Sequence, residues 1–341
     1  MVKHVSNPPN PWESTTVEWI GEPPDARLKI YEEDAKSALA RNDSPDLNFR
    51  WSLNPYRGCF HACAYCYARP THQYLGFGAG TDFERRIVVK RNIAARLEEA
   101  FEKPAWKGEL IALSGNTDCY QPLEASYGLT RACLEVMVRY RNPVGIITKG
   151  SLVRRDVDLL AELAAHNAAR VYVSICFDDA RHARLIEPGT PPPAQRFETM
   201  RYLADAGIPV GLALAPVIPG LNDSQIPAIL ERAADAGASS AFLVPVRLAA
   251  EVRPVFESRL REALPERADR VMNALAEIRD GDVGEARFGH RMRGVGPRWA
   301  AVSRLFRVHS QRLGLVRERD ADGAPAQTPF RRPRAQMDLF S

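Results

Sequence analysis

The sequence predicts an α/β fold, a partial barrel of six parallel strands with an N-terminal extension and a C-terminal helical region. Two observations support this prediction. Strand-like apolar runs alternate with helical patterns between residues 46 and 250, and Gly207 and Gly237 follow two of those patterns, where helices commonly end. Strands joined by helical crossovers run parallel with right-handed connections. Six units are fewer than the eight of a closed barrel, so we expect an open one.

The predicted elements can be given in chain order. Strands are expected at residues 49–53, 109–113, 144–148, 171–177, 210–216 and 241–246. Helices are expected between them, at residues 93–101, 124–140, 151–166, 195–206 and 224–236. Parallel barrels bind ligands at the carboxyl ends of their strands, so the loops that follow these strands are where a site is expected.

The flanking regions differ from the barrel in composition. Residues 1–45 are rich in proline and acidic residues, and we expect an extension that wraps around the domain or is partly disordered. Residues 46–250 form the predicted barrel. Residues 251–316 form a helical region, with patterns at 257–264, 268–279 and 300–313, and residues 317–341 form a polar, proline-rich tail that we expect to be flexible.

Composition indicates a globular protein, because 45% of the 341 residues are hydrophobic and 26% are charged. No apolar run is long enough to cross a bilayer, and residues 1–11 lack the apolar core of a secretory signal. We therefore expect a cytoplasmic protein with no membrane partner. The net charge of +4 is too small to establish nucleic-acid binding, although arginines cluster at 85–86 and 291–293.

Three cysteines follow the first predicted strand at close spacing. Cys59, Cys63 and Cys66 form a C-x3-C-x2-C triplet, with Tyr65 just before the last cysteine. Three thiolates can ligate three corners of a [4Fe–4S] cluster, whereas a cluster held by protein alone takes four. The triplet therefore predicts a cluster whose fourth iron binds a substrate or cofactor. We expect the remaining cysteines, at positions 119, 133 and 176, to be thiols rather than disulfides.

Two other interpretations of the triplet remain. A zinc ion could take His61 as its fourth ligand, although His61 lies between two cysteines of the same loop and structural zinc needs four closed ligands. The three cysteines could instead be buried and inert, although scattered thiols rarely fall into this spacing.

The cysteine spacing and the aromatic residue resemble the signature of the radical S-adenosylmethionine (SAM) enzymes. The resemblance implies a partial (β/α)6 barrel of the radical SAM type, with Cys59, Cys63 and Cys66 holding the cluster. It also implies that SAM binds the open iron and that one electron, from a donor such as flavodoxin or ferredoxin, cleaves it to a 5′-deoxyadenosyl radical.

The resemblance further implies a SAM-binding loop at the end of the second strand. This loop offers hydrogen-bond acceptors to the SAM ammonium, and glycine in it lets the backbone approach closely. Its residues are Ser114, Gly115, Asn116, Thr117 and Asp118. A competing interpretation is that Thr117 or Asp118 caps the helix around residue 124.

Other SAM contacts are expected at four positions. Lys149 ends the third strand and could neutralise the SAM carboxylate, and Ser174 in the fourth could bind the carboxylate or the ribose. Pro216 opens a turn after the fifth strand that could line the adenine, and Tyr65 is the aromatic of the signature. A surface lysine and a packed strand hydroxyl are the alternatives for Lys149 and Ser174.

Longer motifs resemble one group within this superfamily, the bacterial proteins related to spore photoproduct lyase and described as DNA-repair photolyase-like. The resemblance covers residues 31–315 and implies a lyase-like enzyme that acts in DNA repair. Its motifs lie at residues 54–59, 67–72, 80–83, 116–118, 120–122, 148–149, 155–156 and 218–220. Rival interpretations are radical modification of a protein, tRNA or small molecule, and a non-catalytic iron–sulfur or SAM-binding protein.

The sequence departs from that group at a functional position. Spore photoproduct lyases carry a hydrogen-donor cysteine just before a Ser/Thr-Asp pair, and this chain has Gly115 and Asn116 before Thr117 and Asp118. No catalytic residue is assigned by this resemblance. The candidates are Cys119, Cys176 and Tyr120.

The extreme C-terminus carries a second resemblance. Gln336, Met337, Asp338, Leu339 and Phe340 resemble the pentapeptide by which bacterial repair proteins bind the replicative sliding clamp. Apolar anchors on a polar tail suit docking to a partner. The competing interpretation is that the tail folds back and buries Leu339 and Phe340 on its own barrel. The predicted partners are therefore DNA and the sliding clamp.

Overall fold

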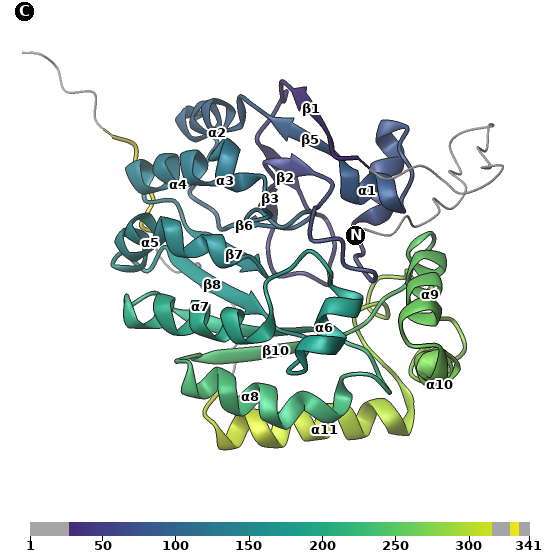
Figure 1. The fold of residues 1–341 in the computed structure, drawn as a ribbon. Helices are drawn as coiled ribbons and strands as arrows, with labels where there is room; N and C mark the ends of the chain where they lie inside the picture. Colours follow the sequence, from purple (N-terminus) through teal and green to yellow (C-terminus); the bar gives the residue numbers. More distant parts are fainter. Residues whose placement is uncertain (1–26, 316–327, 334–341) are drawn as a thin grey trace, which may run out of the picture.

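A seven-stranded sheet forms the centre of the computed structural model, which describes residues 27–315 and 328–333 (Figure 1). Six of its strands are parallel and follow one another in chain order; β2 (Leu39–Arg41) pairs antiparallel at one edge. The parallel strands are β3 (Trp51–Leu53), β6 (Ile111–Leu113), β7 (Val144–Thr148), β8 (Ala169–Ser174), β9 (Val210–Val217) and β10 (Ser240–Pro245). This arrangement confirms the predicted α/β partial barrel of six parallel strands.

The helices lie along one face of the sheet, in the order of the strands (Figure 1). They are α2 (Ile93–Glu102), α3 (Glu124–Tyr127), α4 (Leu129–Tyr140), α5 (Val157–Ala164), α7 (Pro193–Asp205) and α8 (Ile226–Asp235). The single helix expected at 124–140 is divided because Gly128 adopts a left-handed φ of 62°. Two other predicted helices begin with 3-10 turns, Ser151–Asp156 and Asp223–Gln225.

The main core lies between the sheet and these helices. Ile111, Ile146 and Val171 from the strands meet Leu97 and Leu134 from the helices, and all five are fully buried. Burying apolar area here is the main stabilising contribution, at roughly 25 cal/mol per Å². The core therefore fixes the strands, and with them the loops at their carboxyl ends.

A small second sheet was not predicted. Its strands are β1 (Lys29–Glu33), β5 (Arg86–Lys90) and β4 (Tyr56–Arg57), with β5 in the middle, and α1 (Thr81–Arg85) precedes β5. Together with β2, this sheet builds residues 29–41 of the predicted extension into the domain. The side chains of β1 are mostly exposed, so its sequence shows no alternation that would have predicted a strand.

The C-terminal helical region packs against two parts of the barrel. Helices α9 (Val252–Ala263) and α10 (Pro265–Glu277) lie beside α6 (Ala180–Ile186) and share a core cluster with the cysteine loop, which includes Phe256, Leu260 and Cys63. Helix α11 (Gly296–Arg312) lies along α8 (Figure 1). Within the described residues, no helix combines the length and apolarity that crossing a membrane requires.

Six residues of the predicted flexible tail are docked on the barrel. Phe330 packs against Phe101 and Tyr140, with ring centroids 5.8 and 6.1 Å apart, and Thr328 Oγ1 donates to the Gly108 carbonyl at 2.7 Å. The Arg332 guanidinium donates to three carbonyls at the end of α2 and just after it, those of Phe101, Lys103 and Trp106. The prediction of a flexible tail is therefore wrong for residues 328–333.

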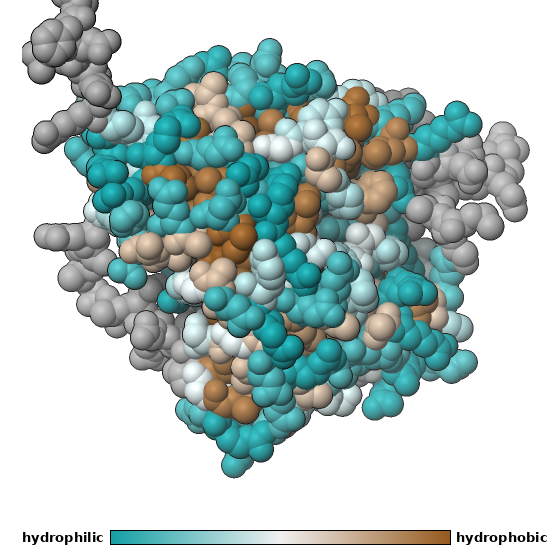
Figure 2. All heavy atoms as spheres, turned by 60° about the vertical axis from the view of Figure 1, so that its left-hand side comes forward, coloured by the Kyte–Doolittle hydropathy of each residue, from teal (hydrophilic) through white to brown (hydrophobic). Residues whose placement is uncertain are grey.

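This docked segment lies beside α4, at the end of the barrel opposite the carboxyl ends of the strands (Figure 1). Figure 2 looks onto this side of the molecule, where apolar patches are separated by hydrophilic atoms. Phe101 of α2, Tyr140 of α4 and Phe330 of the segment pack together there and cover this end of the core.

Replacing Phe330 with alanine should lower the free energy of unfolding by about 2 kcal/mol, because a half-buried ring loses less than the 3–5 kcal/mol of a fully buried one. Chemical denaturation followed by circular dichroism measures this change. The neighbouring exposed residue supplies the control: Arg331→Ala should change stability by less than about 0.5 kcal/mol. Equal effects of the two substitutions would contradict the docking.

Candidate functional site

The cysteine loop lies at the carboxyl ends of the strands, between β4 and the 3-10 helix Arg69–Leu75. Cys59 and Cys63 are buried and Cys66 is half-buried. Burial raises the pKa of the Cys66 thiol to about 11; the charge of Cys59 adds to this effect and Arg69 opposes it. The thiols are thus close enough to influence one another.

The donor set of the loop suits an iron–sulfur cluster, because three thiolates can ligate three irons of a cubane. No three His, Cys, Asp or Glu side chains converge on one metal position in the part of the chain that is described. In a cubane cluster each cysteine ligates a different iron, so its sulfurs stand farther apart than the ligands of one zinc ion. The Nδ1 of His61 faces the Asp118 carboxylate at 3.3 Å.

The backbone of the loop is held by peptide groups from three other segments. The Cys59 amide donates to the Phe83 carbonyl at 2.9 Å, and the Ala64 amide donates to the Ile186 carbonyl at 2.9 Å. The Gly189 amide donates to the His61 carbonyl at 3.0 Å. Gly189 approaches so closely that a Cβ there would lie 2.2 Å from the Phe60 oxygen, so this position requires glycine.

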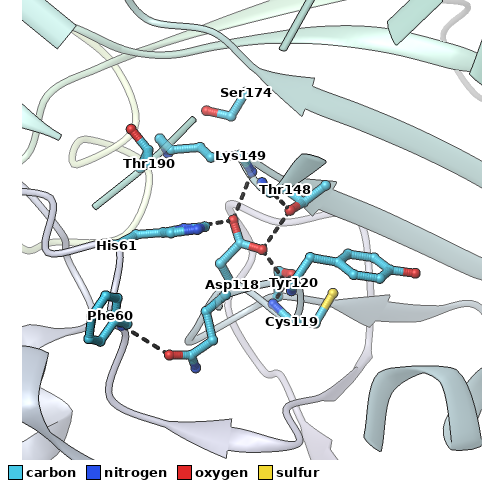
Figure 3. A network of polar contacts seen from close by, with 12 residues as sticks. Phe60, His61, Asp118, Cys119, Tyr120, Thr148, Lys149, Ser174 and Thr190 are labelled. Atoms are coloured by element: carbon cyan, nitrogen blue, oxygen red, sulfur yellow. Dashed lines mark hydrogen bonds and ion pairs between the residues drawn. The ribbon is translucent and has the colours of Figure 1, made fainter. Parts of the chain in front are cut away.

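Gln121 holds the same loop through its side chain. Its Oε1 accepts from the Phe60 amide at 3.0 Å, and its Nε2 donates to the Gly58 carbonyl at 3.2 Å (Figure 3). A side-chain amide can both accept and donate, which suits it to replace a strand partner. Gln121 is fully buried, so these bonds are shielded from water.

Asp118 joins the cysteine loop to β6 and β7 (Figure 3). Its carboxylate accepts from Thr148 Oγ1 at 2.6 Å, from the Lys149 amide at 2.7 Å and from the Tyr120 amide at 3.0 Å. Burial alone would raise the pKa of Asp118, but His61 and these donors hold it well below its usual range. The pair is therefore charged, and the carboxylate is occupied by partners within the protein.

His61 is the other half of this pair. Burial lowers its pKa, but the charges of Asp118 and Cys59 outweigh burial and raise it to about 9.

The prediction that Thr117 or Asp118 caps the helix around residue 124 is wrong. Residue 123 precedes α3 without a side-chain cap, and Thr117 Oγ1 donates to the Tyr56 carbonyl at 2.9 Å.

The loop that precedes Asp118 carries half-buried polar groups. Ser114 adopts a φ of 72°, a left-handed conformation that is costly for serine, and its Oγ accepts from the Cys119 amide at 3.0 Å. The Asn116 side-chain nitrogen donates to Thr71 Oγ1 at 3.3 Å, and the Gly115 carbonyl accepts from Tyr67 Oη at 2.6 Å. No bond to the Asn116 side-chain oxygen is formed among the described residues, which leaves it available to a ligand.

Tyr65 belongs to a second buried network at the ends of β7 and β8. Its hydroxyl donates to the Glu187 carboxylate and lies 3.6 Å from Cys176 Sγ. Glu187 pairs with Arg196 at 2.6 Å, and the Lys149 ammonium lies 5.6 Å from the centroid of the Tyr65 ring. Burial opposes the charge on Lys149, but Cys63 and Glu187 outweigh it and raise the pKa of Lys149. A positive charge therefore stands beside the cysteines.

The remaining predicted cofactor residues lie next to this network. Ser174 Oγ donates to the Ala215 carbonyl at 3.3 Å. Pro216 follows a cis peptide bond in β9, and its carbonyl accepts from Asn222 Nδ2 at 3.1 Å. Both therefore line the same end of the sheet as Lys149 (Figure 3 shows Ser174).

The three catalytic candidates divide between the core and the site. Cys119 is fully buried in the main core, and the Tyr120 hydroxyl turns away to donate to Asp156 at 3.1 Å. Cys176 is the candidate that the structure brings to the site, where its thiol donates to the Ala215 carbonyl at 2.9 Å near Tyr65. Burial raises the pKa of the Cys176 thiol to about 11, so it is protonated.

Several residues around the loop escaped the sequence analysis. All of them lie outside the cysteine motif in the sequence and reach the loop only in the folded chain. They are Glu84, Gln121, Glu187, Arg196 and Arg259. Arg69 and Gln121 lie in motifs that carry the resemblance, which was the available signal, but nothing in the sequence pairs a motif residue with Arg259.

The arginine clusters at 85–86 and at 291 have partners within the protein. Arg85 lies over Phe60, Arg86 pairs with Asp82, and Arg291 pairs with Asp46.

Comparisons with known proteins agree with this geometry. The profile of the radical SAM superfamily matches residues 53–233, more than half of the 341 residues. An uncharacterised protein of Mycobacterium tuberculosis is 39% identical over 246 residues, 71% of this chain and 72% of the relative. An uncharacterised protein of Methanocaldococcus jannaschii is 29% identical over 200 residues, 59% of this chain and 72% of the relative.

Solved structures share the fold. Spore photoproduct lyase complexed with dinucleoside spore photoproduct has a TM-score of 0.60 and 16% identity, covering 83% of this chain and 79% of that one. A double mutant of that enzyme with bound AdoMet and dinucleoside spore photoproduct has a TM-score of 0.60 and 18% identity, covering 87% and 85%. Family membership implies a [4Fe–4S] cluster and SAM, and the buried cysteine triplet fits that implication. This chain is a member of the radical SAM superfamily.

Proposed function

We propose that this protein is a lyase-like radical SAM enzyme of the cytoplasm that acts on damaged DNA. The observation that carries the radical chemistry is the loop of three closely spaced cysteines, whose peptide groups are held by other segments of the barrel. When bound, the cluster and SAM supply a carbon radical that removes a hydrogen atom from the substrate. Flavodoxin or ferredoxin is the electron donor that we propose.

The residues around the loop bind and orient the cofactor. Cys59, Cys63 and Cys66 hold the cluster. Lys149 provides the positive charge for the SAM carboxylate, and the Asn116 side-chain oxygen accepts from the SAM ammonium. Asp118 does not contact SAM directly in this proposal, because its carboxylate is already bound to His61 and to the Lys149 amide. It supports the residues that do. Tyr65 and Ser174 line the SAM site beside Lys149.

The proposed substrate is suggested by the structural likeness to spore photoproduct lyase. The structural likeness to spore photoproduct lyase shows a shared fold, and that enzyme forms a complex with a dinucleoside spore photoproduct. This chain has no thiol at positions 115 and 116, so lesion reversal would need a different hydrogen donor, and Cys176 is the cysteine closest to Tyr65 among those outside the loop.

A second function is radical modification of a protein, tRNA or small molecule. The observation that favours it is the engagement of Arg85, Arg86 and Arg291 with partners inside the protein, which reduces the basic surface for DNA. A panel of oligonucleotides containing defined lesions, incubated anaerobically with reduced enzyme and SAM, separates the two: product from any lesion supports repair, and none supports the second function.

Anaerobic reconstitution should load about four irons per chain, and Cys59→Ala, Cys63→Ala and Cys66→Ala should each prevent it, because three thiolates carry the cluster. Iron analysis and visible absorption measure the loading. Cys133→Ala is the matched control, since this buried thiol lies in the main core, and it should load iron normally. Stoichiometric zinc in place of iron would overturn the cluster.

Asn116→Ala should weaken SAM binding about tenfold without changing iron content, because it removes an acceptor that faces the ligand. Asp118→Asn should instead reduce iron loading, since it breaks the charged pair with His61 that holds the loop. Equilibrium dialysis with SAM and iron analysis distinguish the two effects. Identical behaviour of the two variants would contradict these separate roles.

The proposed partner of the tail is the bacterial sliding clamp. The motif at residues 336–340 lies outside the described residues, and the docked segment 328–333 ends just before it. A peptide of residues 336–341 should bind the clamp with a Kd on the order of micromolar, which corresponds to a binding free energy of about −8 kcal/mol. Fluorescence anisotropy measures this affinity.

Leu339→Ala combined with Phe340→Ala should remove most of the affinity, because two apolar anchors of about 1.5–3 kcal/mol each make the contact. The full-length double variant should lose clamp binding and keep its iron. Failure of the full-length wild-type protein to bind the clamp would remove the link to replication and favour the modification enzyme.

A further inference from the structure

We propose that Arg259 on α9 is a positioning residue for the cysteine loop, so that the C-terminal helical region completes the cluster site. The proposal depends on the proposed function only in taking Cys59, Cys63 and Cys66 as the cluster ligands. It assigns a role to a residue that lies 197 positions after the loop residue it contacts.

Arg259 bridges the loop and α1. Its Nη1 donates to the Ala62 carbonyl at 2.5 Å, and its Nη2 donates to both carboxylate oxygens of Glu84 at 2.6 and 2.7 Å. The guanidinium is largely buried, and burial is the main cause that lowers the pKa of Arg259. One planar group thus joins three segments of the chain: the loop, α1 and α9.

Ala62 is a position where the loop needs such support. It lies between Cys59 and Cys63 with a φ of 56°, a left-handed conformation that is unfavourable for any residue with a Cβ. The hydrogen bond from Arg259 to its carbonyl opposes relaxation of the loop to an ordinary conformation. Because this carbonyl belongs to the peptide that leads into Cys63, its orientation helps to set the position of that ligand.

A second arginine acts on the neighbouring peptide. Arg69 is fully buried and donates to the Cys63 carbonyl at 2.7 and 3.1 Å and to Glu84 at 2.5 Å. Glu84 is also fully buried, so one carboxylate ties together two guanidiniums that each hold a carbonyl of the loop. Consecutive peptides, those of Ala62 and Cys63, are fixed in this way.

This arrangement is better explained by positioning than by stability. A buried group of three charged side chains loses the solvation of all three, and apolar residues of similar volume often stabilise a fold equally well. Apolar residues cannot donate to two loop carbonyls. A cluster with three protein ligands depends on their fixed placement, and supporting hydrogen bonds around metal ligands are worth roughly 10- to 100-fold in affinity in other sites.

The test compares Arg259→Lys and Arg259→Gln with wild type in two assays. The first is the rate of iron release from reconstituted protein to a ferrous chelator under anaerobic conditions, which should rise about tenfold. The second is the rate at which the cysteines of the iron-free protein react with a thiol reagent, which should also rise. Lysine keeps a charge beside Glu84, so it is the variant expected to fold normally, but it lacks the two separate nitrogens with which Arg259 bonds Ala62 and the carboxylate.

Two control variants complete the experiment. Arg261→Ala removes an exposed arginine of the same helix that pairs with Glu257 and Asp269, and both rates should stay at the wild-type value. Leu134→Ala removes a fully buried side chain of α4 in the main core, which does not include the cysteines of the loop, and should lower the melting temperature without loosening the loop.

The outcomes separate positioning from general stability. Faster iron release and thiol reaction in Arg259→Lys than in Leu134→Ala, at an equal or smaller loss of melting temperature, support the proposal. Equal rates in the two variants at equal stability, or wild-type rates in both Arg259 variants, overturn it. The thiol assay needs neither SAM nor turnover, so failure of wild-type protein to cleave SAM would count against the proposed function alone.

Discussion

The rest of the site depends on one constraint, which is that a buried loop without helix or strand must still satisfy its peptide groups. Unpaired buried amides and carbonyls each cost free energy comparable to a lost hydrogen bond. The loop that carries Cys59, Cys63 and Cys66 meets this requirement with partners from Phe83, Ile186 and other segments around the barrel. The loop conformation is thereby set by its surroundings, and a cluster can bind without ordering it first.

Three acidic side chains support the loop, of which Glu84 and Glu187 are buried and Asp118 is half-buried. Asp118 holds the loop through His61, Glu187 through the Tyr65 hydroxyl, and Glu84 through two arginines. Each carboxylate comes from a different part of the chain, so the loop is tied to β6, to the region after α6 and to α1. Removing one partner from such a pair leaves an uncompensated charge, which makes each pair costly to break even where its net contribution to stability is small.

Two groups near the cysteine loop stand out, a thiol and an ammonium. Positions 115 and 116 carry no thiol, whereas Cys176 lies by Tyr65 with a protonated sulfur. Lys149 places a positive charge between that network and the cysteines. Radical SAM chemistry follows from the family, and Cys176 and Lys149 are two groups that the proposed function uses.

Local patterns in the sequence determined the six parallel strands in order, nearly all the helices of the barrel and the cysteine triplet, because apolar runs, helix ends and ligand spacing are properties of short segments. The tertiary structure decided what long-range pairing controls. Only in the folded chain does β1 pair with β5, Phe330 pack against Phe101, and Asp118 lie beside His61. It also brought Arg259 to Ala62. A partner nearly two hundred residues away leaves no local trace, since burial and pairing of a charge depend on the folded surroundings and not on the residues beside it in the chain.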